Sequence, residues 1–276
     1  MLRDFVRIRK DILSRNWPID DEIASTAATI DSHRFLQNPA GQYAYVYLTQ
    51  YVKAVSEKHF GVPFSQIDIL DWGCGKGHVS KLLGDLGPHR LESCDIERES
   101  EDSAFGQETP ILERFQIAVT PLLHTSDLPY ADATFDVVVS FGVLEHVAND
   151  AASIAEITRI LKPGGLFFCF YLPTKYSWTQ KVAHVRGNDY HDRLYTRASI
   201  DALARPVKLE VCDVWYRQIF PKVRPAPRDP CFTRCPTRCP QKSGHLRFCF
   251  CFCFCFCFWQ ARPRMVRERT RVKRRG

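Results

Sequence analysis

Residues 69–83 read ILDWGCGKGHVSKLL, and this stretch decides the fold. An apolar run ends in an acid, Asp71, and glycines follow at positions 73, 75 and 77. From Val79 onward the apolar residues are spaced as on one face of a helix. We therefore expect a buried strand, a tight turn and the start of a helix, in that order. Glycine lets a ligand approach the backbone closely. The free N–H groups at a helix start attract polar ligands, so the stretch predicts a binding site.

The glycine spacing narrows the kind of ligand. The dinucleotide fingerprint G-x-G-x-x-G would place its third glycine where this chain has His78, and a P-loop would follow Lys76 with Ser or Thr instead of Gly77. The pattern Asp-x-Gly-x-Gly-x-Gly instead resembles the first motif of class I S-adenosylmethionine-dependent methyltransferases. The alternative is a glycine-rich turn that joins a strand to a helix and binds no ligand.

A second acid lies at a distance that is typical of nucleotide sites. Residues 90–96, RLESCDI, are expected to form the second strand, which contains Asp95. Asp95 follows Gly75 by 20 residues, about the separation at which βαβ nucleotide sites place the acid that binds the ribose. A carboxylate at this position can accept hydrogen bonds from both ribose hydroxyls.

Strand and helix patterns alternate along the chain. Strands are expected at residues 67–71, 90–96, 117–123, 137–139, 166–172 and 209–218, and helices at residues 43–60, 79–86, 150–161 and 199–204. This alternation predicts an α/β, Rossmann-like fold with a mostly parallel sheet and helices on both faces. The helix at residues 43–60 is interpreted either as a lid over the cofactor or as a helix packed on the sheet edge. Residues 100–107 look like helix and loop.

Two later segments extend the family resemblance. Residues 124–147, HTSDLPYADATFDVVVSFGVLEHV, and residues 159–170, RILKPGGLFFCF, look like later motifs of the small-molecule branch, with a domain similar to methyltransferase type 11. With the first motif, the resemblance covers roughly residues 67–172. It implies S-adenosylmethionine as the cofactor. By this resemblance, Asp71 and the glycine loop would surround the methionine part of the cofactor. Asp95, in the second strand, would bind the ribose. The cofactor-binding residues implied are Asp71, Gly73, Cys74, Gly75, Gly77, Asp95, Ile96, Asp127, Leu128 and Phe141.

The adenine contact departs from the family's pattern. Family members usually carry an acid a few residues before the Leu-Pro pair, and this chain has His124 there, followed by Asp127. Asp127 is therefore a candidate for the adenine side, and a solvent-exposed turn acid is the alternative.

The segment after the fourth strand departs from two patterns of related enzymes. Where DNA- and RNA-base N-methyltransferases carry Asn/Asp-Pro-Pro-aromatic, this chain has Ser140-Phe141-Gly142, which argues against that class. Relatives that act on quinone-type phenols bind a divalent cation with Glu-x-x-Glu-His. Here only Glu145-His146 remain, so no metal is predicted. His146 is a candidate general base; alternatively, the dipeptide caps and orients the next helix.

Residues that contact the methyl acceptor are expected in two places. One is the helix at residues 43–60, and the other is the polar segment after the fifth strand, at the ligand-facing end of the sheet. A solvated polar loop is the alternative for the second segment. The candidates are Tyr43, Tyr47, Tyr190, His191 and Tyr195.

Charge and cysteine divide the chain at about residue 221. Residues 222–276 hold 15 Lys and Arg against two acids, whereas residues 1–221 hold 23 against 29. Four cysteines are scattered over the body, and the other eight lie between Cys231 and Cys257. The N-terminus is too charged for a secretory signal and no apolar run is long enough to span a bilayer. We expect a cytoplasmic chain with unpaired thiols and no membrane partner.

The last segment has an unusual composition. Cys231, Cys235 and Cys239 do not match the paired C-x2-C spacing of structural zinc sites, and residues 248–258 alternate strictly between Phe and Cys. We interpret residues 221–276 as a disordered or frameshifted tail, so that the last antiparallel strand of the sheet is missing or replaced. The alternative is a basic tail that binds nucleic acid.

These observations predict three regions: a helical extension or lid at residues 1–60, a methyltransferase domain at residues 61–220, and the tail. The expected activity is transfer of a methyl group from S-adenosylmethionine to a small molecule, at oxygen rather than nitrogen or carbon. The alternatives are an RNA or protein methyltransferase aided by the basic tail, and a non-catalytic cofactor-binding protein. The motifs do not name the acceptor, because methyl transfer mainly requires alignment of the nucleophile.

Overall fold

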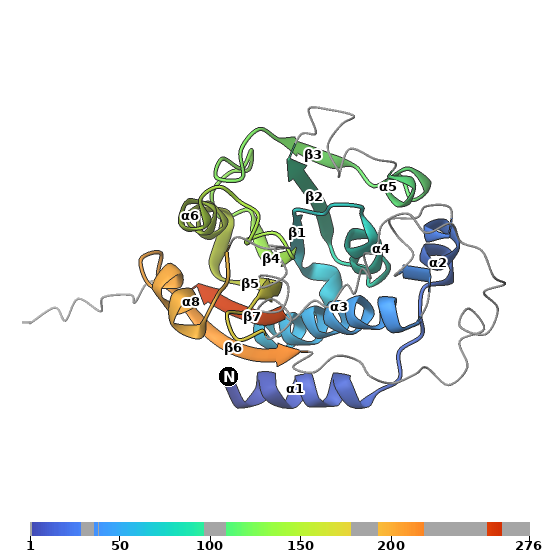
Figure 1. The fold of residues 1–276 in the computed structure, drawn as a ribbon, viewed down its shortest axis with the longest axis horizontal. Coiled ribbons are helices and arrows are strands. Elements are labelled where there is room, and N and C mark those ends of the chain that lie inside the picture. Colours follow the sequence, from blue (N-terminus) through green and yellow to red (C-terminus); the bar gives the residue numbers. More distant parts are fainter. Residues whose placement is uncertain are drawn as a thin grey trace, which may run out of the picture.

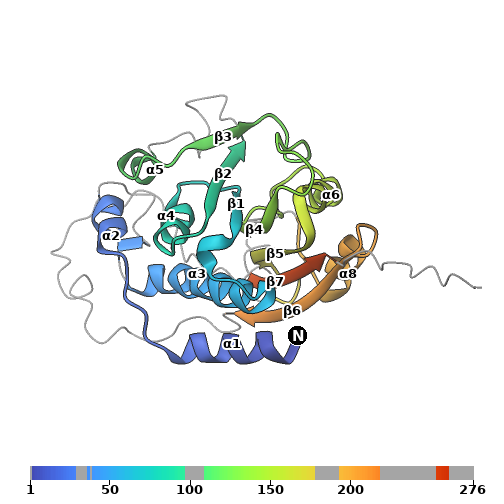
Figure 2. The same ribbon diagram turned by 180° about the vertical axis from the view of Figure 1, so that it is seen from behind.

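In the computed structural model, the described residues are 2–28, 36–37, 39–96, 109–177, 193–217 and 253–260. They contain a seven-stranded sheet in the order β3-β2-β1-β4-β5-β7-β6, with helices on both of its faces (Figures 1 and 2). The strands are β1 Asp68–Trp72, β2 Arg90–Ile96, β3 Val119–Leu122, β4 Phe135–Phe141, β5 Leu161–Pro173, β6 Leu209–Arg217 and β7 Cys253–Gln260. The helices are α1 Leu2–Ser14, α2 Asp21–Ala27, α3 Pro39–Phe60, α4 His78–Asp85, α5 Pro110–Arg114, α6 Asp150–Ile160 and α8 Arg197–Ala204.

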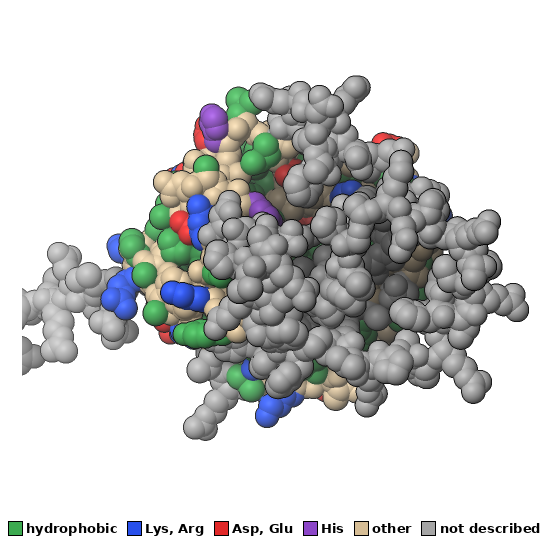
Figure 3. All heavy atoms as spheres, viewed as in Figure 1, with side chains coloured by type: hydrophobic (Ala, Val, Ile, Leu, Met, Phe, Trp, Pro, Cys, Tyr) green, Lys and Arg blue, Asp and Glu red, His purple; other side chains and the backbone are tan. Residues whose placement is uncertain are grey.

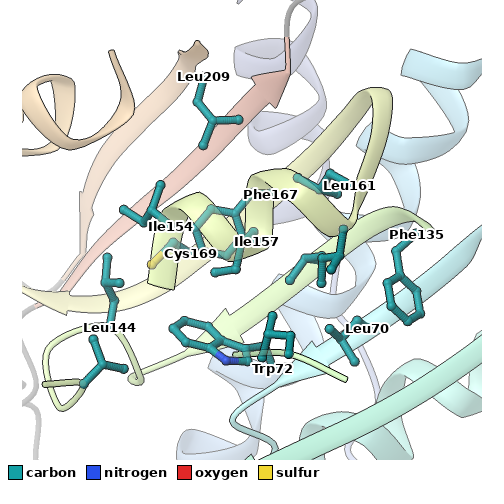
Figure 4. Close-up of a cluster of buried hydrophobic side chains, with 14 of the residues drawn as sticks. Leu70, Trp72, Phe135, Leu144, Ile154, Ile157, Leu161, Phe167, Cys169 and Leu209 are labelled. Atoms are coloured by element: carbon teal, nitrogen blue, oxygen red, sulfur yellow. The ribbon is translucent and has the colours of Figure 1, made fainter. Parts of the chain in front are cut away.

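The two helical layers bury opposite faces of the same strands, because successive side chains of a strand point to opposite sides. Leu70, Val138 and Phe167 belong to a core that includes residues of α6 and α8. Their neighbours in sequence, such as Ile69 and Phe168, belong to a second core with residues of α1, α3 and α4. Figure 4 shows the first core, with side chains of β1, β4, β5 and α6 packed together. The predicted three-layer α/β fold is confirmed.

The order of the strands positions the functional site. Strands β1 to β5 are parallel, and β1 lies between β2 and β4. The chain therefore builds the sheet in one direction from β1 to β3 and in the other from β4 to β5. In open α/β sheets, a ligand binds outside the carboxyl ends of the strands at such a reversal. The glycine loop follows β1 at this point.

The far edge of the sheet is completed by the segment in which Phe and Cys alternate. The backbone of β7 pairs antiparallel with β5, with Leu166 opposite Trp259, and with β6, with Leu209 opposite Gln260. Within the described residues β6 pairs with β7 and with no other strand. The sequence predicted that the last antiparallel strand is missing or replaced. In the structure, β7 takes the place of this strand. Whether this segment is in its native reading frame stays a prediction, as does the division into three regions.

Most elements lie where the sequence predicts them, with bounds that differ by a few residues. The expected helix at residues 43–60 is α3, and Tyr51, Val52 and Val55 on it are buried in the second core. The strand expected at 166–172 begins earlier, at Leu161, whose backbone is already extended. The short helix α5 was not expected, and residues 100–107 and 221–252 lie outside the described part. Cys74, Cys94, Cys169 and Cys212 are free thiols. Among the described residues, no helix is both long and apolar enough to cross a membrane.

Candidate functional site

The loop after β1 is held close to other parts of the chain at one glycine and is open at the next. Gly73 has a φ of +74°, and a Cβ there would lie 2.5 Å from one methyl group of Val143. Gly75 has a φ of +55°, and a Cβ there would have no atom within 4 Å. Gly73 is thus required by packing, whereas Gly75 faces open space. A ligand can approach the backbone at Gly75 as the sequence predicts.

Asp95 joins this loop to the end of β2. The Gly75 N–H donates a hydrogen bond of 2.6 Å to Asp95 Oδ2, and the Ile96 N–H donates one of 2.8 Å to Oδ1. The N–H groups of Gly73 and Cys74 also donate to the carbonyl of Cys94, at 2.8 and 3.1 Å. A carboxylate has about four lone-pair sites, so Asp95 can accept further hydrogen bonds from a ligand while it holds the loop.

Asp71 lies beneath the loop and is almost completely buried. The Ser80 hydroxyl of α4 donates a hydrogen bond of 2.6 Å to Asp71 Oδ2, and the Ser93 hydroxyl of β2 donates one of 3.0 Å to Ser80. Burial raises the pKa of the Asp71 carboxyl to about 7, against the lowering effect of the Ser80 hydrogen bond. Asp71 therefore connects β1, α4 and β2 under the candidate site.

The turn after β4 contains an unusual buried acid. The Glu145 side chain is 3% exposed, and no described residue forms a hydrogen bond with its Oε2 atom. Burial raises the pKa of its carboxyl to about 8. His146 is mostly exposed, with Nε2 3.9 Å from Glu145 Oε1. The expectation that this dipeptide caps the next helix is wrong, because Asn149 is the N-cap of α6 and accepts a 3.1 Å hydrogen bond from the Ala152 N–H.

Two residues after β5 hold this turn in place. The Arg193 guanidinium donates hydrogen bonds to the carbonyls of Leu144, Val147 and Ala148, at 2.8 to 3.3 Å. The Tyr195 hydroxyl donates to the Leu144 carbonyl at 3.0 Å, and burial raises the pKa of Tyr195. Tyr195 is 2% exposed, so its ring has almost no surface to offer an acceptor. Its contacts give it a role in supporting the Glu145 turn.

Aromatic rings from four elements meet near this turn. The Tyr45 ring of α3 lies 4.5 Å from the His78 ring, edge to face, and 5.3 Å from the Tyr171 ring, measured between centroids. The Phe141 ring is 6.0 Å from both tyrosine rings. All four residues are partly exposed. We refer to Tyr45, His78, Phe141 and Tyr171 as the aromatic cluster.

Tyr171 has a strained backbone. Its φ is +65°, a conformation that costs a residue with a Cβ roughly 1–2 kcal/mol. It lies at the carboxyl end of β5, where the register with β7 shifts between Phe170 and Leu172. Such strain is found preferentially at binding and catalytic sites. The strand pattern of the sequence gives no sign of this conformation.

The family comparison agrees with this geometry. A family model described as a methyltransferase domain matches residues 70–169, which include the glycine loop, Asp95 and the Glu145 turn. Residues 70–169 are therefore similar to a methyltransferase domain. Ubiquinone biosynthesis O-methyltransferase of Maricaulis maris is 34% identical over 116 residues, covering 40% of this chain and 44% of that protein. An S-adenosylmethionine-dependent methyltransferase of Mycolicibacterium smegmatis is 28% identical over 153 residues, covering 53% of each. The chain thus spans about half the length of these relatives.

A solved structure has a similar fold. The complex between the Haloferax volcanii Trm112 methyltransferase activator and a methyltransferase contains a chain with a TM-score of 0.51 and 18% identity. The match covers 88% of this chain and all of that one. At this identity the likeness concerns the fold alone.

The other residues that the sequence predicts for the site differ in how exposed they are. Ile96 is 47% exposed at the end of β2, and Asp127 is exposed on the loop after β3. Leu128 is buried, and its N–H donates a 3.1 Å hydrogen bond to Glu156 of α6. Tyr47 is fully buried in the second core, while Tyr43 is partly exposed and stacks on it. Tyr190 and His191 lie outside the described residues.

The sequence did not point to Tyr45 and Tyr171, whose rings lie close together in the structure. Tyr45 is one of several tyrosines on the same helix, which was a partial signal. Their spacing does not say which of them faces the sheet. No group of three or more His, Cys, Asp or Glu side chains in the described part of the chain is arranged to hold a metal ion.

Proposed function

We propose that the chain is an S-adenosylmethionine-dependent methyltransferase that transfers a methyl group to an oxygen atom of a small molecule. The hydrogen bond between Gly75 and Asp95 carries this proposal, because it sets a carboxylate beside open backbone at the carboxyl ends of β1 and β2. When bound, S-adenosylmethionine supplies an electrophilic methyl carbon. The protein then has to bind the cofactor and align the acceptor atom.

The described residues fit this cofactor. The space at Gly75 would admit the methionine part, and Asp95 has lone pairs left for the ribose hydroxyls. Asp71 would hold the loop from below through Ser80. Asp127 and Leu128, on the loop after β3, are the proposed adenine side.

Oxygen is the proposed acceptor atom for two reasons. The relative from Maricaulis maris is named an O-methyltransferase of ubiquinone biosynthesis. His146 is mostly exposed beside Glu145, where a neutral imidazole is suited to take the proton of a hydroxyl group. The proposed role of His146 is that of general base.

Calorimetry with the full chain tests the cofactor site. We expect S-adenosylmethionine and S-adenosylhomocysteine to bind, and we expect Asp95→Ala to weaken both. Asp201→Asn is the matched control, because Asp201 is an acid of α8 that pairs with the neighbouring Arg197. The absence of cofactor binding by the wild type would overturn the proposed function, and binding without turnover on any acceptor would favour a non-catalytic protein.

The charge of residues 222–276, 15 Lys and Arg against two acids, supports RNA methylation as a second candidate. Figure 3 shows Lys and Arg side chains at separate places on the described part of one face, over α8 among others. Deleting the tail would also remove β7, so the test replaces the basic residues of 261–276 with Gln. A salt-sensitive RNA affinity that this change abolishes would favour the second candidate.

A further inference from the structure

Polar side chains of α6 hold the loop that runs from β3 to β4 (Figure 1). Ser153, Glu156 and Arg159 follow one another at intervals of three residues, so that each is a neighbour of the next on the helix surface. We refer to these three residues as the α6 row. The Ser153 hydroxyl donates a 3.3 Å hydrogen bond to the hydroxyl of Thr125. Glu156 Oε2 accepts a 3.1 Å hydrogen bond from the Leu128 N–H.

Arg159 binds the same loop at two backbone carbonyls. Its guanidinium donates hydrogen bonds to the carbonyl of Leu128 at 3.0 Å and to that of Tyr130 at 2.8 Å. It also donates to both carboxylate oxygens of Glu156, at 3.0 and 2.8 Å. These hydrogen bonds lower the pKa of the Glu156 carboxyl, so it stays charged and accepts from the Leu128 N–H. The N–H and the carbonyl of Leu128 are therefore both held by α6.

The loop begins beside the carboxylate that we assign to the ribose. In the sheet, Asp95 lies opposite Pro121, and Ile96 lies opposite Leu122, the last residue of β3. The strands β1, β2 and β3 are neighbours in that order. With the methionine part at the glycine loop after β1 and the ribose at the end of β2, the base lies on the far side of the ribose. It would therefore meet the loop after β3.

Polar groups of this loop are open to a base. Within the described residues, neither the Thr125 N–H nor the Ser126 N–H donates a hydrogen bond to the protein. Thr125 is partly exposed, and Ser126 and Asp127 are exposed. Adenine offers ring-nitrogen acceptors and an amino donor, which match the backbone N–H groups and the Asp127 carboxylate. Hypoxanthine has a carbonyl oxygen in place of the amino group, so it would set an acceptor against this carboxylate.

We infer that the α6 row makes the site selective for adenine over hypoxanthine, because it fixes residues 125–130 in the shape that adenine requires. This inference rests on the proposed methyltransferase function and adds the residues that set its base selectivity. Ser153, Glu156 and Arg159 are positioning residues, since they act on the base through the loop. A fixed loop leaves the polar groups of the wrong base unpaired, whereas a loop that shifts can adapt to it.

Calorimetry with the full chain tests this inference with two ligands. S-adenosylhomocysteine carries adenine, and S-inosylhomocysteine carries hypoxanthine. We expect the wild type to bind the adenine compound about tenfold more tightly or better. We expect Arg159→Met to lower this affinity ratio by about threefold or more. A residue that only stabilises the fold would change both affinities by the same factor and leave the ratio as it is.

Conservative variants test the individual hydrogen bonds. Glu156→Gln keeps an oxygen that can accept from the Leu128 N–H and should retain most of the ratio, whereas Glu156→Met should lower it. Ser153→Ala removes one hydroxyl group from a buried position and should lower the ratio by about twofold. If Arg159→Met does not fold, Glu156→Met and Ser153→Ala give the same test.

Arg197→Met is the matched control. Arg197 donates hydrogen bonds to an acid of its own helix, Asp201, as Arg159 does to Glu156. Among the described residues, Arg197 forms no hydrogen bond with the loop after β3. The affinity ratio of this variant should equal that of the wild type.

The outcomes separate this inference from the proposed function. If the wild type does not bind S-adenosylhomocysteine, the proposed function is wrong, and the inference fails with it. If the wild type binds both ligands equally, the inference alone is overturned. A ratio that stays at the wild-type value in the folded variants of the α6 row would also overturn it, as would an equal fall in Arg197→Met and Arg159→Met.

Discussion

The backbone N–H of Gly75 donates a 2.6 Å hydrogen bond to the carboxylate of Asp95, 20 residues further along the chain. This hydrogen bond ties the loop after β1 to the end of the neighbouring strand β2. A charged acceptor and a backbone donor form one of the stronger kinds of hydrogen bond in proteins. The loop is therefore held in shape before a ligand arrives.

Asp95→Ala is expected to weaken cofactor binding by about 1–3 kcal/mol, because it removes charge-assisted hydrogen bonds to the ribose and frees the Gly75 N–H. Isothermal titration calorimetry with S-adenosylhomocysteine measures this change. Asp95→Asn keeps one acceptor oxygen and should fall between the wild type and the alanine variant. An affinity equal to that of the wild type would remove Asp95 from the ribose site.

Gly73→Ala and Gly75→Ala are expected to differ in what they damage. A methyl group on Gly73 would clash with the branched side chain of Val143 at 2.5 Å, which has little rotamer freedom. We expect this clash to cost roughly 1–3 kcal/mol of the free energy of unfolding, in addition to about 1–2 kcal/mol for the φ of +74°. A methyl group on Gly75 would meet no other atom. Gly75→Ala should therefore lower the free energy of unfolding only through its positive φ, by about 1–2 kcal/mol.

Cofactor affinity distinguishes these two variants further. The methyl group of Gly75→Ala would occupy the space at which the cofactor approaches, so this variant should bind S-adenosylhomocysteine more weakly than its stability implies. Urea denaturation and calorimetry on the same samples provide both quantities. Full cofactor affinity in Gly75→Ala would contradict the assignment of that space.

The stability of the protein should fall with rising pH because of Glu145. Burial raises the pKa of this carboxyl from 4.5 to about 8. A carboxyl with a higher pKa in the folded state stabilises the fold fully below pH 4.5, and this contribution disappears as the pH rises through about 8. Relative to Glu145→Gln, the wild type should lose on the order of a few kcal/mol of unfolding free energy between about pH 5 and about pH 8. Urea denaturation at both pH values tests this, and a constant difference between the two proteins would argue against a neutral, buried Glu145.

Tyr195→Phe separates a supporting role from acceptor contact. The change removes the hydrogen bond from the Tyr195 hydroxyl to the Leu144 carbonyl and should cost about 0.5–1.5 kcal/mol of unfolding free energy, because Arg193 still donates a hydrogen bond to this carbonyl. Affinity for S-adenosylhomocysteine should stay close to that of the wild type. A large loss of methyl-transfer activity without a loss of stability or of cofactor affinity would return Tyr195 to the acceptor site.

The sequence predicts those parts of the fold that depend on local chemistry. The bounds of β2 agree with the prediction at both ends, because a Gly-Pro turn precedes this strand and a strongly charged segment follows it. The glycine loop is recognisable because its conformation requires glycine at particular positions. The separation between Gly75 and Asp95 follows from the length of one strand–helix–strand unit.

The acceptor side could not be predicted in the same way. Tyrosines at 43, 45, 47 and 51 lie on different sides of α3, and the sheet buries Tyr47 and Tyr51 while Tyr45 turns to the aromatic cluster. Only the packing of α3 on the sheet makes this choice. The positive φ of Tyr171 is imposed by neighbouring strands, and its own sequence gives no warning of it.

Strand β7 sets the order in which the fold can be completed. It lies between β5 and β6, yet it follows both of them in the chain. During synthesis, β5 and β6 leave the ribosome first and cannot pair across the gap until β7 has emerged. This long-range pairing is a slow kind of folding step, and open strand edges attract other chains while they wait. We therefore expect the nascent protein to depend on chaperones until its last strand is in place.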